Sequence, residues 1–147
     1  MNKLLFVLFL LNITTQAFAA DDAWDKLIKA TCLKCTYVDG TMGDWIKGDL
    51  KLEKCNPVPP AVFDSINLKG GTARLIGNQG SADVIVIPTP SGITFMETTG
   101  TGNVVFTTVF PVYKKYSNDF IAVTSRHMNL PGGPLPSQCH GTCKIWE

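Results

Sequence analysis

The chain has 147 residues, of which 45% are hydrophobic and 17% charged, with 13 basic and 12 acidic side chains. This length predicts a single domain. A disordered chain would have fewer apolar residues and an excess of one charge, and a protein that binds nucleic acid or anionic lipid by charge would be basic. The composition therefore excludes a disordered chain, disfavours a nucleic-acid partner and predicts a globular domain.

The amino-terminal residues predict export. Lys3 provides a positive charge, Leu4–Leu11 form an unbroken apolar run, and Ala17–Ala19 form a small-x-small cleavage site. The apolar run is too short for a membrane-spanning helix, which needs about 20 residues. We expect a cleaved signal peptide at residues 1–19, and a single β-rich domain at residues 20–147 in the periplasm or outside the cell, without a membrane anchor.

One short helix is predicted at Asp21–Ala30, because an aspartate can cap its start and Trp24, Leu27 and Ile28 fall on one face. The next segment, Thr31–Pro60, contains three cysteines and many turn-forming residues. We expect this segment to be mostly coil, a cover held in place by disulfides.

From Thr72 onward, short apolar and β-branched segments alternate with turn residues at intervals of about ten residues. Connections this short join antiparallel neighbours, so the pattern predicts a meander. Together with two weaker candidates there are about eight strands, which is enough for a small closed barrel, and a two-sheet sandwich is the alternative. The candidates are Thr72–Gly77, Ala82–Ile87, Ile93–Thr99, Val104–Phe110, Phe120–Arg126 and Gln138–Trp146, with Asp49–Glu53 and Ile66–Lys69 as the weaker ones.

Val84–Ile87 are apolar at four consecutive positions, a pattern typical of a strand that is covered on both faces. We therefore expect a second layer over part of the sheet, and the amino-terminal helix with Trp24 is the candidate for it.

Five cysteines are disulfide candidates in an oxidising compartment: Cys32, Cys35, Cys55, Cys139 and Cys143. Their pairing stays open, and so does a disulfide-linked dimer through the odd thiol. A bridge from Cys32 or Cys35 to Cys55 would close a short loop. An extended strand would hold Cys139 and Cys143 about 13 Å apart, too far for a bridge. That arrangement favours a long bridge from the amino-terminal cysteines to the last strand.

The Cys32-Leu33-Lys34-Cys35 spacing also occurs in thiol redox enzymes, so an envelope redox enzyme is an alternative function. However, the predicted helix precedes this pair, and the carboxyl end of a helix disfavours a thiolate. Cys32, Cys35, Cys139, His140 and Cys143 have the side-chain types of a zinc site. Disulfides explain these residues better, and we predict neither a metal nor another cofactor.

No sequence motif for catalysis is present, and the chain has only two histidines, His127 and His140. We therefore expect a non-catalytic binding protein whose partner is an unknown protein or small ligand. Small barrels bind through their mouth loops or a central cavity. Strand alternation places Arg126 and His127 on opposite faces at a strand end, where either could contribute to binding.

The Pro88–Gly92 loop is a further candidate, because its two prolines stiffen it and it ends in Ser91 and Gly92. The five residues Ser91-Gly92-Ile93-Thr94-Phe95 resemble the Ser-Gly-x-x-aromatic motif of the periplasmic inhibitors of c-type lysozyme. That resemblance implies a small exported barrel that inserts the Ser91 loop into the lysozyme cleft. Phe95 stands where that family has tyrosine.

Overall fold

The computed structural model describes residues 22–46, 48–54 and 58–147. The expected signal peptide at residues 1–19 and the candidate cysteine Cys55 lie outside the described residues. The described part contains a helix at residues 22–29 and nine strands. The strands are β1 (Leu33–Ile46), β2 (Asp49–Lys54), β3 (Ala61–Asn67), β4 (Thr72–Gly77), β5 (Gly80–Thr89), β6 (Gly92–Thr98), β7 (Val104–Tyr113), β8 (Phe120–Leu130) and β9 (Gly133–Ile145).

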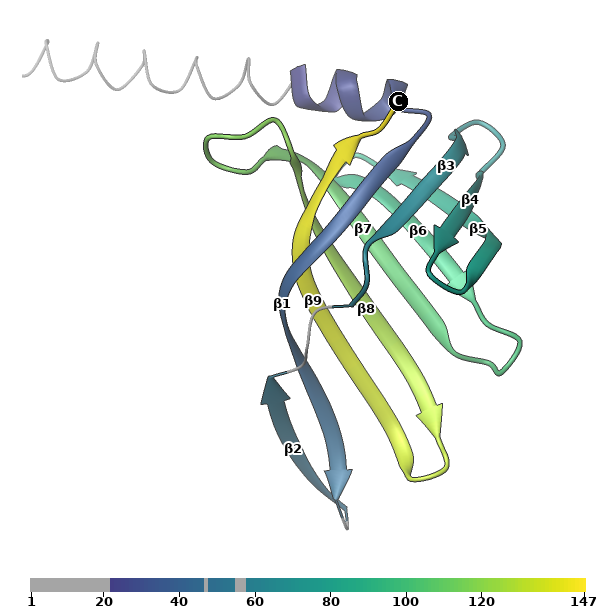
Figure 1. Ribbon diagram of the computed structural model, residues 1–147, viewed down its shortest axis with the longest axis vertical. Helices are drawn as coiled ribbons and strands as arrows, with labels where there is room; N and C mark the ends of the chain where they lie inside the picture. The colour runs from purple at the N-terminus through teal and green to yellow at the C-terminus, as the bar shows by residue number, and fades with distance from the viewer. Residues whose placement is uncertain (1–21, 47, 55–57) are drawn as a thin grey trace, which may run out of the picture.

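The strands form one antiparallel barrel (Figure 1). Strands β3 to β9 pair in chain order, and β1 closes the sheet by pairing with both β3 and β9. Strand β2 pairs with β1 beyond this closure, so the barrel consists of eight strands and carries a projecting β1–β2 hairpin. The predicted meander barrel is confirmed, and the sandwich alternative is not observed.

The prediction of coil for Thr31–Pro60 is wrong, because β1 is the longest strand of the described chain and holds the barrel closed. Apolar residues alternate over its first half, where Leu33, Cys35 and Tyr37 are buried. The glycines and aspartates of its second half, Asp39, Gly40, Gly43 and Asp44, lie where the strand pairs first with β9 and then with β2. The turn-like composition of this segment therefore led to the wrong prediction for β1.

The Asn129–Ser137 stretch is rich in proline and glycine, yet it forms the tip of the β8–β9 hairpin. The two strands pair as far as Leu130 and Gly133. Pro134 and Pro136 lie where β9 pairs with β8 but not with β1. An edge strand tolerates proline because a backbone N–H is not required on its open side.

The helix covers one end of the barrel, the end at which the β7–β8 loop lies (Figure 1). Ala23, Leu27 and Ala30 are buried in the same apolar cluster as the inward residues of the strands. Trp24 is partly buried and packs against that cluster, as expected. Burying these side chains closes the barrel end to water.

Strand β5, however, is not covered on both faces. Val84 and Val86 point into the barrel and are buried, whereas Ile85 and Ile87 on the outer face are 51% and 42% exposed. The isoleucines reflect the preference of β-branched residues for strands, not a second layer. The expectation of a covered outer face at Val84–Ile87 is therefore wrong.

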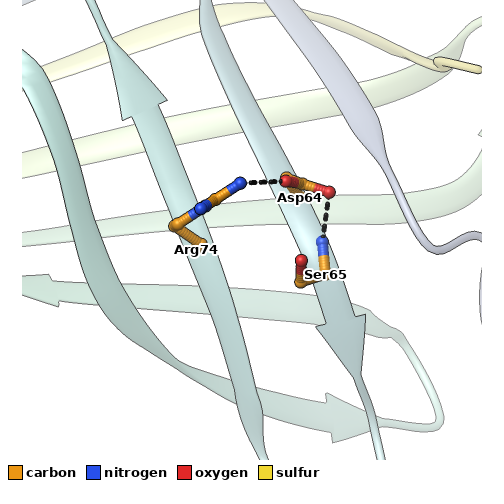
Figure 2. A network of polar contacts seen from close by, with 3 residues as sticks. All are labelled: Asp64, Ser65 and Arg74. Carbon is orange, nitrogen blue, oxygen red and sulfur yellow. Dashed lines mark hydrogen bonds and ion pairs between the residues drawn. The ribbon is translucent and has the colours of Figure 1, made fainter.

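A polar network fixes an irregularity in β3 (Figure 2). The register of β3 against β4 shifts between Asp64 and Asn67, and Ser65 has a positive φ of 54°. One carboxylate oxygen of Asp64 accepts the Ser65 N–H at 2.6 Å, and the other accepts a bond from the Arg74 guanidinium at 2.6 Å. These two bonds lower the pKa of Asp64 and stabilise the irregularity in β3.

Candidate functional site

Two of the disulfide candidates in the described part of the chain form a bridge. Cys35 on β1 is bonded to Cys143 on β9, 108 positions away in sequence. Cys139 and Cys143 both lie in the extended β9 and are not joined, as the spacing argument required. The long bridge from an amino-terminal cysteine to the last strand, which the sequence favoured if β9 is extended, is thus present.

Cys32 does not form a redox pair with Cys35, because Cys35 is bonded to Cys143. The Cys32 thiol is half-buried, and burial together with the nearby Asp64 charge raises its pKa. A raised pKa keeps the thiol protonated near neutral pH, the opposite of what a redox nucleophile needs.

The proposed Ser91 loop is a two-residue turn between β5 and β6. Thr89 and Gly92 pair with each other, and the Thr89 hydroxyl donates to the Gly92 carbonyl and accepts the Ser91 N–H. Ser91 is exposed at the tip. Gly92 is buried with a φ of 154°, and a Cβ there would meet the Val109 carbonyl. The turn is consequently rigid and requires glycine at position 92.

Arg126 and His127 lie on opposite faces of β8, as alternation predicted. The exposed His127 packs edge-on against the Phe106 ring outside the barrel, with ring centroids 5.7 Å apart. Arg126 points inward and lines a cavity. The structure does not bring Arg126 close to Ser91. Ser91 precedes the start of β6, whereas Arg126 pairs with Val105 on β7, which pairs with Glu97 near the other end of β6.

The cavity lies inside the barrel, beyond the aromatic core. Its volume is about 60 Å³, several times the space that one water molecule needs. Phe63 and Phe95, stacked at 4.0 Å, form its apolar floor. The full lining is Tyr37, Val58, Pro59, Ala61, Phe63, Leu75, Phe95, Glu97, Val105, Thr107, Thr124 and Arg126.

One side of the cavity is polar. The buried Thr107 and Thr124 hydroxyls are hydrogen-bonded to each other at 3.0 Å, beside the buried Tyr37 ring. Burial raises the pKa of the Tyr37 hydroxyl, while the two threonines and the charge of Arg126 oppose that increase. The Arg126 Nε is buried and has no hydrogen-bond partner within the described part of the chain. The cavity thus combines aromatic walls with unused hydrogen-bonding capacity.

Of the predicted site residues, the cavity contains Arg126 alone, and sequence reasoning missed Tyr37 and Glu97. Glu97 precedes a glycine-rich turn and has the surroundings of a surface carboxylate in the sequence. Its inward direction could have been predicted from the sequence, because Ile93, Phe95 and Glu97 alternate along β6 and therefore share one face. Tyr37 lay in the segment expected to be coil, so its inward direction had no signal.

Within residues 22–46, 48–54 and 58–147, no cluster of three or more histidine, cysteine or acidic side chains could hold a metal ion. No helix in the same ranges is long and apolar enough to cross a membrane. Comparisons with protein-family models, curated proteins and solved structures found no match to this chain. The resemblance to the lysozyme inhibitors consequently rests on Ser91–Phe95 and on the general size and architecture of the chain.

Proposed function

We propose that the protein is an exported, non-catalytic binding domain whose small ligand enters the barrel interior. The observation that carries this proposal is the cavity, which joins apolar walls to a polar side within an eight-stranded barrel. Barrels of this size are just wide enough to be filled by side chains or to hold one small ligand. Pockets with apolar walls and a few convergent polar groups are typical of ligand sites.

The fold supports export as well. The Cys35–Cys143 disulfide is buried and joins the two strands at which the barrel closes. Such bridges persist in oxidising compartments such as the periplasm or the extracellular space. Together with the predicted signal peptide, the disulfide favours delivery of the mature domain outside the cytoplasm.

The proposal can be tested by native mass spectrometry of the protein isolated from its own compartment, before and after denaturation. We expect a chain that lacks residues 1–19, contains the disulfide, and carries an additional small mass that is lost on denaturation. A chain that retains residues 1–19 in the cytoplasm would contradict export.

The cavity itself is tested by Val105→Phe, which places a larger ring among the lining residues. Val38→Phe is the matched control, because Val38 is 73% exposed on the outside. We expect Val105→Phe to abolish stabilisation by the co-purified molecule or by members of a small-fragment library, and Val38→Phe to retain it. If no compound raises the melting temperature of the parent protein, the cavity is not a ligand site.

Inhibition of c-type lysozyme is a second candidate function, favoured by the exposure of Ser91 at the tip of a turn that Thr89 holds rigid. We expect the protein to slow lysis of cell walls by c-type lysozyme, and Ser91→Trp to abolish this effect. Ser81→Trp, at an exposed position beside another hairpin turn, is the control. Equal inhibition by Ser91→Trp and the parent would eliminate this function.

A further inference from the structure

Two opposite charges line the same cavity. Glu97 on β6 and Arg126 on β8 are each paired in register with Val105, which lies on the strand between them. Because neighbouring strands are about 4.8 Å apart, the two backbones are separated by about 10 Å. Among the described residues, the ion pairs join other side chains, and neither Glu97 nor Arg126 takes part in one.

The Nε of Arg126 is buried, so its lack of a hydrogen-bond acceptor is energetically unfavourable. Its Nε is shielded from solvent without an acceptor, and leaving such a group unpaired costs free energy that a bound acceptor would recover. A guanidinium presents donors in a planar fork that matches the two oxygens of a carboxylate. The lining of the cavity therefore includes a carboxylate-binding group, Arg126, and a carboxylate, Glu97.

We propose that the cavity binds a small zwitterion of the amino-acid kind. Its carboxylate accepts hydrogen bonds from Arg126, its ammonium donates to Glu97, and its short apolar body lies against Phe63, Leu75 and Phe95. In an α-amino acid the ammonium and the carboxylate are bonded to the same carbon atom, so one short molecule can present a donor to Glu97 and an acceptor to Arg126 from within the cavity that both residues line. This inference rests on the proposed function and adds the class of ligand.

Other small ligands fit the two charges less well. A dianion would place negative charge near Glu97, and a cation without a carboxylate would leave Arg126 unpaired. A neutral apolar molecule would desolvate both charges and satisfy neither. The volume of about 60 Å³ also favours a short side chain over a long acyl chain.

The test uses the full mature chain with its disulfide intact, titrated by isothermal calorimetry with L-valine. N-acetyl-L-valine, which lacks the ammonium, and isobutylamine, which lacks the carboxylate, are the matched probes. We expect L-valine to bind and each derivative to bind at least about tenfold more weakly, since each loses a charge-assisted hydrogen bond.

Two variants assign the charges. Arg126→Gln should weaken L-valine binding about tenfold or more and leave isobutylamine binding unchanged. Glu97→Gln should weaken L-valine and isobutylamine and leave N-acetyl-L-valine unchanged. Asp83→Asn, which changes an exposed carboxylate on β5, is the control and should bind as the parent does.

The outcomes separate this inference from the proposed function. If N-acetyl-L-valine or isobutylamine binds the parent as tightly as L-valine, or if both variants bind L-valine normally, the zwitterion assignment is overturned and the cavity remains a ligand site. If no probe and no fragment binds the parent, both proposals fail. Because the three probes are compared on the parent protein, the test stands even where a variant does not fold.

Discussion

Tyr37 couples the barrel interior to pH. Its ring is buried beside Thr107 and Thr124, and burial raises the pKa of its hydroxyl above the ordinary value of 10.0. In the unfolded chain the same hydroxyl ionises near pH 10, so at higher pH ionisation stabilises the unfolded state. The contribution of Tyr37 to stability is therefore complete below pH 10 and is lost as the pH rises beyond it.

We expect Tyr37→Phe to reduce the alkaline loss of stability, because phenylalanine cannot ionise in either state. The measurement is the free energy of unfolding by urea from pH 8 to pH 11, compared as a slope because the variant also loses the hydroxyl contacts. Tyr116→Phe changes a ring that is 93% exposed and should keep the parent slope. Equal slopes for Tyr37→Phe and the parent would contradict this role.

At the scale of elements, the contact between β1 and β9 is unusually close at Gly141. Gly141 is paired with Tyr37 next to a register shift, and a Cβ at Gly141 would overlap the Thr36 carbonyl. Only the absence of a side chain allows the strands to approach in this way, since backbone cannot move aside as a flexible side chain can. The closing seam of the barrel thus depends on one glycine.

We expect Gly141→Ala to lower the free energy of unfolding by about 1 to 3 kcal/mol, the range for overpacked sites. Gly77→Ala is the control, because a Cβ there meets nothing within 4 Å and the residue has no positive φ. Chemical denaturation of both variants is the measurement. An unchanged midpoint for Gly141→Ala would show that the seam can widen without cost.

The sequence predicted the strands from β4 to β9 because their apolar segments are separated by turn residues, and it predicted antiparallel order because the connections are short. It failed at β1, where glycines and aspartates in the second half resemble a loop. The cavity could not be predicted for the same reason. Alternation placed Arg126 opposite His127, but which face is the interior depends on barrel closure, and closure depends on the strand that was missed.

At the scale of the whole molecule, the Cys35–Cys143 bridge lowers the conformational entropy of the unfolded chain. The effect is large because the bridge joins residues 108 positions apart. We expect Cys35→Ser with Cys143→Ser to lower the free energy of unfolding by about 2 to 5 kcal/mol. Cys32→Ser changes a half-buried thiol that forms no bridge and is the control. Equal midpoints in urea for the double variant and the control would mean that the bridge does not stabilise the fold.

The pairing of β1 with β9 also dictates an order of events during synthesis. The ribosome makes β1 before any other strand, and its main partner, β9, comes last of the nine. Until β9 emerges, the chain is an open sheet with two unpaired edges, of the kind that pairs with other chains. A barrel closed in this way completes its fold only after synthesis of the last strand, so premature termination before β9 would yield an aggregation-prone sheet and not a smaller version of the domain.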